Sequence, residues 1–191
     1  MGELFNWDLL TEEDRAVARM IIGGANDDLS ERDPDLVIAP DGKPYLYRWH
    51  ILRERDKASI YFHVQVKSDP ERPPHDHPWD NTSILLSAGG ADVAYVEQLS
   101  INPAGKIYDT QEFERKPGDV IHRKAEHAHR LILPKGTPYT MSLFTCGPVR
   151  REWGFWTGQR NASHDRAWKW VPAHELIEAR GNTSVQKKVE K

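Results

Sequence analysis

The chain has 191 residues, of which 38% are hydrophobic and 29% charged, and its formal net charge is −3. This length fits one domain with a substantial core, and charges of mixed sign argue against nucleic acid as the main partner. The single cysteine, Cys146, excludes an internal disulfide and a multi-thiolate zinc site, which leaves histidine and carboxylate as the main candidate metal ligands.

No segment of the sequence predicts a membrane partner. The longest apolar runs, such as "SILLSAG", are too short to span a bilayer. The N-terminal stretch "MGELFNWDLLTEEDR" is too acidic for a signal peptide. We therefore expect a cytoplasmic protein.

The first predicted element is a helix from about residue 11 to residue 23. Thr11 is a candidate N-cap, acidic residues fill the first turn, and Gly23 and Gly24 end the helix. The following stretch "ERDPDLVIAPDGKPYLYRWHIL" brings three prolines and an Asp-Gly pair before an alternating apolar run. It predicts a loop that enters a strand. Residues 1–43 are thus expected to form an N-terminal helix and a lead-in loop.

Strand-like runs follow, separated by segments rich in turn formers or charge. These runs occupy residues 45–53, 59–67, 81–89, 91–99, 106–115, 119–123, 129–134, 139–146 and 152–158. The pattern predicts an all-β core of eight or nine strands that closes as a jelly-roll barrel or sandwich over residues 44–157. Residues 158–191 should form a C-terminal segment with a short helix between Pro172 and Gly181 and a frayed tail.

Histidines are concentrated in the predicted β block. Six of the nine fall between residues 63 and 129: His63, His75, His77, His122, His127 and His129. His75 and His77 stand two residues apart in "HDHPW", just after two prolines. Because alternate residues of a strand point to the same face, these two imidazoles converge on one point, for which a metal ion is the candidate.

This arrangement resembles the two motifs of the cupin superfamily. The first motif has two histidines separated by one residue, then a glutamate three or four residues later and a glycine further on. His75 and His77 match it, while Asn81 or the next residue stands in the glutamate position and Gly89 or the next residue in that of the glycine. The glutamate is therefore missing.

The second cupin motif has a proline, a glycine and a histidine at the start of a late strand. In "KPGDVIHRKAEHAHRL", a Pro-Gly turn precedes a short strand, and a loop then delivers His129 to the next strand. The resemblance covers about residues 44–157 and implies a cupin double-stranded β-helix, or jelly-roll barrel, with an N-terminal and a short C-terminal helix. The sequence looks most similar to a group of small bacterial and phage cupins with a "HDHPW" signature and a late "REWGFW" segment.

The resemblance implies that His75, His77 and His129 bind one divalent transition metal. Cupin dioxygenases, including the thiol dioxygenases, use such an all-histidine iron site, so Fe(II) is favoured, with Mn, Ni and Zn as alternatives. Three residues are candidates for a fourth ligand: His122, His127 and Asp80. His63 and His127 are the candidate catalytic residues.

Several of these residues also have purely structural interpretations. His63 is equally typical of a hydrogen-bonded core residue, and Asp76 and Asp80 are typical of loop caps that could also orient a ligand histidine. Four tryptophans are expected to pack the C-terminal segment over the barrel: Trp153, Trp156, Trp168 and Trp170. Five arginines have the pattern of surface charges, one or two of which could bind a substrate carboxylate or phosphate: Arg48, Arg53, Arg123, Arg150 and Arg151.

The sequence thus predicts a metal-dependent cupin that acts on a small polar metabolite, most readily as an Fe(II)-dependent dioxygenase-type oxidoreductase. One alternative is a metal-dependent sugar or sugar-phosphate isomerase or epimerase, in which His63, His127 or Glu126 moves a proton. The other is a non-catalytic cupin that binds a small ligand. Family resemblance also suggests a homodimer.

Overall fold

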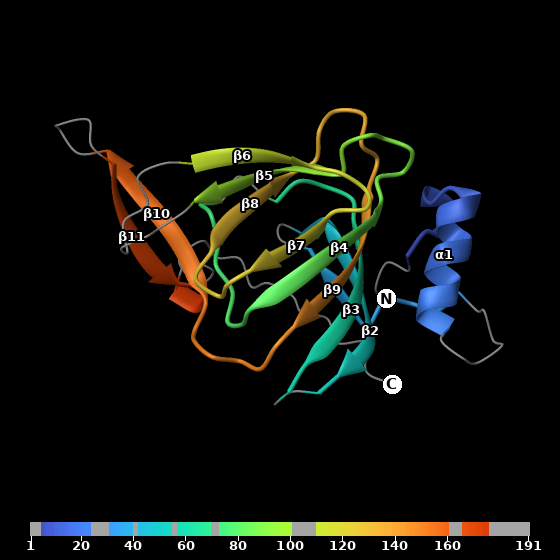
Figure 1. Ribbon diagram of the computed structural model, residues 1–191, viewed down its shortest axis with the longest axis horizontal. Helices are drawn as coiled ribbons and strands as arrows, with labels where there is room; N and C mark the ends of the chain where they lie inside the picture. The colour runs from blue at the N-terminus through green and yellow to red at the C-terminus, as the bar shows by residue number, and fades with distance from the viewer. Residues whose placement is uncertain are drawn as a thin grey trace.

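The computed structural model describes residues 5–23, 31–39, 42–54, 57–69, 73–100, 110–160 and 166–175. Within these residues, the 3-10 helix η1 (Trp7–Leu9) and the helix α1 (Glu12–Gly23) precede eleven strands (Figure 1). The strands are β1 (Leu36–Ile38), β2 (Leu46–Arg53), β3 (Ser59–Gln65), β4 (Asn81–Ser87), β5 (Tyr95–Ser100), β6 (Thr110–Arg115), β7 (Val120–Arg123), β8 (Ala128–Ile132), β9 (Thr140–Cys146), β10 (Gly154–Arg160) and β11 (Arg166–Pro172).

The strands form two antiparallel layers. One is a six-stranded sheet with the order β1-β2-β3-β9-β4-β7. The other contains β6-β5-β8 and the hairpin β10-β11, which are joined by His75 because it forms bridges to both His129 on β8 and Phe155 on β10. From β3 to β10 the chain crosses repeatedly between the layers, which is the connectivity of a jelly-roll barrel. The predicted all-β cupin-type fold is confirmed.

The nine predicted strands correspond to β2 through β10, but the prediction missed two strands. β1 has only three residues and lies in the stretch assigned to the lead-in loop, where it pairs with β2. β11 lies in the segment expected to be without strands, and it pairs with β10 along its whole length. The structure enters a helical turn at Ala173, and the rest of the predicted C-terminal helix and the tail lie outside the described residues.

The helix predicted over residues 11–23 is confirmed as α1. The Thr11 hydroxyl accepts a hydrogen bond from the Asp14 backbone N–H at 3.1 Å, as an N-cap does. Asp14 is buried, and its carboxylate accepts hydrogen bonds from the Ser87 hydroxyl at 2.7 Å and the Tyr139 hydroxyl at 2.6 Å. The start of the helix is therefore attached to the turns at the ends of β4 and β9.

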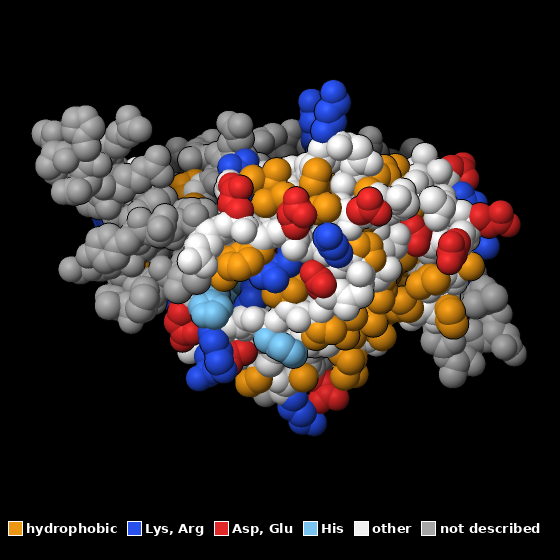
Figure 2. Space-filling view, turned by 45° about the horizontal axis from the view of Figure 1, so that its top comes forward, with side chains coloured by type: hydrophobic (Ala, Val, Ile, Leu, Met, Phe, Trp, Pro, Cys, Tyr) orange, Lys and Arg blue, Asp and Glu red, His pale blue; other side chains and the backbone are white. Residues whose placement is uncertain are grey.

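The surface carries mixed charge. Figure 2 shows acidic and basic side chains scattered among hydrophobic ones, with histidine side chains on the same face. Among the described residues, the most exposed large hydrophobic side chains are those of Met20 and Val149. No helix in the described part of the chain has the length and apolar character needed to cross a membrane.

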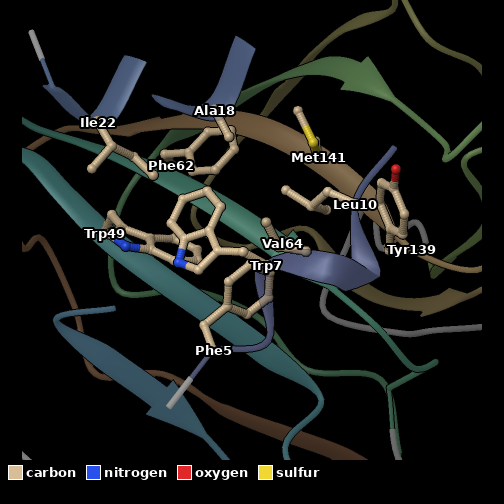
Figure 3. Packing of buried hydrophobic residues seen from close by; sticks show 10 residues of the cluster. All are labelled: Phe5, Trp7, Leu10, Ala18, Ile22, Trp49, Phe62, Val64, Tyr139 and Met141. Carbon is tan, nitrogen blue, oxygen red and sulfur yellow. The ribbon is translucent and has the colours of Figure 1, made fainter. Parts of the chain in front are cut away.

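The larger hydrophobic core lies between the outer face of the six-stranded sheet and the N-terminal segment (Figure 3). The sheet contributes Trp49, Phe62, Val64 and Met141, and the N-terminal segment and α1 contribute Phe5, Trp7, Leu10, Ala18 and Ile22. The Phe5 ring packs edge-on against both Trp7 and Trp49, with centroids 5.2 and 5.1 Å away. Each such buried side chain contributes about 1.5–3 kcal/mol, so this core anchors α1 to the barrel.

A smaller core fills one end of the barrel interior. Leu85, Ala88, Ala94, Tyr95 and Ile121 are buried there, with Leu131 and Leu133 packed against them. The period of two along β8 places these two leucines on the same side of the strand as His129. The apolar lining expected beyond His129 is thus present, and the polar residues described below share the same interior.

Candidate metal centre

The structure brings together the three histidines that the sequence predicts as ligands. One ring nitrogen from each of His75, His77 and His129 lies within 4.8 Å of those of the other two, and the Nε2 atoms of His77 and His129 are 2.9 Å apart. The backbones of His75 and His129 exchange two hydrogen bonds, of 3.0 and 2.9 Å. Because directly opposed residues of an antiparallel pair share a face, this pairing aligns their side chains.

Asp76, between the two histidines, faces the other way and fixes the segment in place. Its fully buried carboxylate accepts hydrogen bonds from the Gly154 backbone at 2.7 Å, the Arg151 guanidinium at 2.8 Å and the Trp170 indole at 2.9 Å. A Cβ at position 154 would lie 2.8 Å from the Trp170 ring, so only glycine lets the backbone of β10 come this close to Trp170. The predicted loop-stabilising role of Asp76 is therefore observed, with β10 and β11 as its support.

Glu97 is the residue of the site that the sequence analysis missed. It lies on β5, is fully buried, and its Oε1 accepts a hydrogen bond from Nδ1 of His129 at 3.0 Å. Donation from Nδ1 leaves the Nε2 lone pair of His129 free to face the cluster, as in histidines that ligate metals. The available signal was a glutamate two residues from Tyr95 on one strand, which places it on the same inward face.

Two arginines neutralise Glu97. The Arg123 Nε lies 2.5 Å from one carboxylate oxygen, and Arg115 Nη2 lies 2.7 Å from the other. The side chain of Arg123 is 2% exposed, so its predicted surface position is wrong. The reason is strand parity, because on β7 Ile121 and Arg123 both point inward. Arg123 also donates to the Ser83 and Tyr95 hydroxyls at 3.0 and 3.2 Å.

These contacts set the charge states of the centre. Burial raises the pKa of Glu97, but the hydrogen bond from His129 and the charge of Arg123 outweigh it and hold the pKa well below its usual range. Burial lowers the pKa of His129 to about 3, because the hydrogen bond to Glu97 offsets only part of the desolvation. Burial, followed by the neighbouring His129 and His75, lowers the pKa of His77 well below its ordinary value. Glu97 is thus ionised and these two imidazoles are neutral at pH 7.

The candidates for a fourth ligand do not join the cluster. Among the described residues, only the three histidines named above form a group with metal-binding spacing. His122 is exposed and its Nδ1 lies 2.8 Å from the Thr82 hydroxyl. Asp80 instead accepts hydrogen bonds from the Ala125 backbone at 2.9 Å and Arg150 at 2.9 Å. His127 lies half-buried in the turn before β8.

His63 lies on the inner wall of the six-stranded sheet and is buried. Its Nε2 accepts a hydrogen bond from the Nε of Arg48 at 2.8 Å. The Phe144 ring stacks on His63 with centroids 5.2 Å apart and lies 6.3 Å from the His77 ring, so Phe144 stands between them. Burial, and then the charge of Arg48, lower the pKa of His63 well below its ordinary value.

A pocket of about 510 Å³ is linked to the cluster through Trp79, one of its walls. Its walls include Arg53, Ser59, Tyr61, Trp79 and Cys146. The Trp79 ring stacks on His77 with centroids 5.0 Å apart, and the Tyr61 ring stacks on His63 at 6.1 Å. The pocket therefore shares aromatic walls with both the three-histidine cluster and the inner sheet wall.

Asn81 is one of the two residues, with Thr82, that can stand in the position of the missing motif glutamate. It is 4% exposed, and neither its Nδ2 nor its Oδ1 has a hydrogen-bond partner in the part of the chain that the structure describes. Its neighbours across the sheet are Arg123 and the pocket residue Cys146. Such a buried amide is unusual in a folded protein and is consistent with a polar group that the protein chain itself does not supply.

The donor set fits a divalent first-row transition metal. Imidazole nitrogen suits Fe, Ni, Cu and Zn, and three such donors leave further coordination positions open. His77 and His129 are neutral, which is the form that ligates metal, and Glu97 orients one of them through its other ring nitrogen. The residues present can therefore hold the ion that the cupin resemblance implies.

No protein-family model and no curated protein matches the sequence. Solved structures that match part of the chain include KdgF from Halomonas sp., with 15% identity and a TM-score of 0.39 over 56% of this chain and 84% of that one. Hydroxypropylphosphonic acid epoxidase from S. wedmorenis matches with 14% identity and a TM-score of 0.42 over 66% and 63%. A cupin superfamily protein from Desulfitobacterium hafniense DCB-2 matches with 14% identity and a TM-score of 0.38 over 77% and 99%. At these values no activity carries over, and the cupin-type jelly-roll fold rests on the strand order and pairing described above.

Proposed function

We propose that this protein is a metal-dependent cupin enzyme whose ion is held by His75, His77 and His129. The observation that carries the proposal is the convergence of three imidazole nitrogens, with Glu97 fixing one of them. Burying a carboxylate with two arginine partners costs several kcal/mol per desolvated ion, which is a large cost if Glu97 only orients an ordinary buried histidine. Because Glu97 lies behind His129, we assign it the function of orienting this ligand.

The favoured reaction is Fe(II)-dependent oxygenation of a small polar metabolite. An ion with three neutral imidazole ligands supplies Lewis acidity and redox chemistry at its remaining coordination positions. The chain itself supplies the environment. Trp79 and Phe144 cover one side of His77 and limit the access of water, and the adjacent pocket has room for a small molecule.

The two predicted catalytic histidines have different prospects. His63 already accepts a hydrogen bond at Nε2 from Arg48, so a proton can reach that nitrogen only if the bond is broken. His127 is half-buried outside the cluster. We keep both as candidate residues of the substrate site, and isomerase chemistry and ligand binding without turnover as the alternative outcomes of the experiment below. The cytoplasmic location, the homodimer and the grouping with "HDHPW" cupins stay predictions.

The test is elemental analysis by mass spectrometry of tag-free protein purified anaerobically, beside a His75→Ala/His77→Ala variant. We expect near-stoichiometric iron in the wild type and none in the double variant. The matched control is His122→Ala, an exposed histidine on β7, which should keep its metal. Oxygen consumption with candidate substrates then separates an oxygenase from an isomerase.

Other outcomes would redirect the proposal. Manganese, nickel or zinc at stoichiometric level would favour isomerase or hydrolytic chemistry at the same site. If the wild type takes up no metal even after reconstitution, or if the double variant binds as much as the wild type, the metal-dependent proposal is wrong. Tight retention of a small molecule without turnover would instead favour a binding protein.

A further inference from the structure

Arg48 is a cation on the inner wall of the sheet. It lies on β2, directly opposite His63 on β3, and its Nε donates to His63. Its guanidinium carbon lies 4.7 Å from the centroid of the Tyr61 ring, which is a wall of the pocket. Its charge also contributes to lowering the pKa of His77, so the guanidinium is within electrostatic reach of the three-histidine cluster.

Three arginines that reach the interior have carboxylate partners, whereas Arg48 has none among the described residues. Arg123 and Arg115 pair with Glu97, and Arg151 pairs with Asp76. Within the described residues, no carboxylate oxygen lies within ion-pair distance of Arg48, whose neighbours are tyrosines, Cys146 and a neutral histidine. A cation taken out of water without a counter-charge is costly, so an anion beside Arg48 would stabilise the fold.

We propose that Arg48 binds the anionic group of the substrate, a carboxylate or a phosphate, beside the Tyr61 wall of the pocket. The role as substrate rests on the proposed function, whereas the binding of the anion itself does not. His63 acts as the positioning residue: by accepting from Nε, it leaves both Nη groups of the guanidinium for the ligand. Planar, two-pronged donation of this kind is the geometry in which arginine recognises carboxylate and phosphate.

Two further features support an anion in this place. Arg48 keeps some exposed surface, although burial is the main cause that lowers the pKa of its guanidinium. Arg53, at the rim of the same pocket, adds a second positive charge that attracts anions, and no acidic residue is among the residues that line the pocket. The aromatic walls exclude water and strengthen the charge-assisted hydrogen bonds inside.

The experiment titrates the protein with inorganic phosphate, and separately with acetate, while the arginine Nε–H signals are followed by ¹H–¹⁵N NMR. We expect the Arg48 signal to shift in a saturable way, with a dissociation constant on the order of 1 mM. Arg48→Gln should weaken binding by at least about 30-fold, because it removes the charge from a partly buried ion pair. Arg48→Lys keeps the charge but not the planar, two-pronged donation of the guanidinium, and should weaken binding by about 10-fold.

Lys57→Gln is the matched control, because the Lys57 side chain is exposed, pairs with Glu54 just before β3 and is not among the residues that line the pocket. We expect a change of less than about 3-fold, since exposed charges are largely screened. The inference is overturned if phosphate and acetate leave Arg48 unshifted, or if Arg48→Gln and Arg48→Lys bind both anions as the wild type does. The lysine variant keeps the test valid if the glutamine variant does not fold.

The same titration on chelator-treated protein separates this inference from the proposed function. Binding that depends on Arg48 should persist without metal. If binding is lost with the metal and unchanged in the Arg48 variants, the ion is the anion site and the inference fails. Conversely, if the wild type takes up no metal but still binds phosphate through Arg48, the metal-dependent function fails and this inference stands.

Discussion

The two faces of the six-stranded sheet use the same strands for opposite purposes. On β2, Trp49 faces outward into the aromatic core while Arg48 faces the barrel interior, and on β3 Phe62 and His63 divide in the same way. The outer face packs apolar rings beneath α1, whereas the inner face carries buried charges and the Asn81 amide, which has no hydrogen-bond partner among the described residues. Stability and chemistry are thus assigned to alternate residues, which means that a change at one need not disturb the other.

The largest effect is expected from Trp49→Ala on the outer face. Trp49 is fully buried against Phe5 and Phe62, so removing its ring should lower the free energy of unfolding by about 3–5 kcal/mol. This change is measured by urea unfolding, followed by far-ultraviolet circular dichroism and not by tryptophan fluorescence. Leu52→Ala on the same strand, where the side chain is 42% exposed, should stay within about 0.5 kcal/mol of wild type. Equal losses in the two variants would contradict the division between the faces.

Glu97→Gln should affect both stability and metal affinity. Without the carboxylate, Arg123 keeps a buried charge whose main partner is gone, so the free energy of unfolding should fall by about 3 kcal/mol. Metal affinity, measured by competition with a chelator, should fall about 10–100-fold because His129 loses the anion behind it. Glu112→Gln, at an exposed position on neighbouring β6, should change neither quantity. If metal affinity is unchanged in Glu97→Gln, Glu97 does not support His129 as a metal ligand.

Acid should destabilise the inner face through His63. Its folded-state pKa lies well below the unfolded value of about 6.5, because of burial and the charge of Arg48. The unfolded chain therefore binds a proton that the folded chain does not, and stability is lost as the pH falls below about 6.5. Between pH 7.5 and pH 5.0 this group should cost about 2 kcal/mol.

The measurement is urea unfolding at both pH values for wild type and His63→Gln. The variant should lose about 2 kcal/mol less than the wild type over this interval. His122→Gln, at an exposed position, should keep the wild-type loss. If His63→Gln and wild type have the same pH dependence, His63 is not held neutral by its surroundings.

The smallest effect is expected from Asn81→Leu. Replacing an amide whose two polar atoms have no described partner removes no hydrogen bond, so metal-free protein should unfold within about 1 kcal/mol of wild type or at higher urea. Asn81→Ala is the companion variant, which separates the loss of volume from the loss of polarity. A loss above about 2 kcal/mol for the leucine variant would show that the amide has a buried partner.

Local patterns were sufficient for most of the fold. Thr11 and the glycines predicted α1 because capping acts within one turn. Alternation and turn residues predicted β2 through β10, because they report which side of a strand is buried. β1 is too short to have a recognisable period, and β11 was missed because its final residue, Pro172, suggested a helix start.

By itself, the sequence determined α1 and β2 through β10, the jelly-roll class and the convergence of His75 with His77, since each depends on spacing along the chain. Only the tertiary structure decided that Glu97 and Arg123 lie inside and that Arg48 stands without a carboxylate partner among the described residues. A charged residue on a strand has the same local pattern whether its face meets water or a second sheet. The opposing layer decides which, and its contacts are made by residues distant in the sequence.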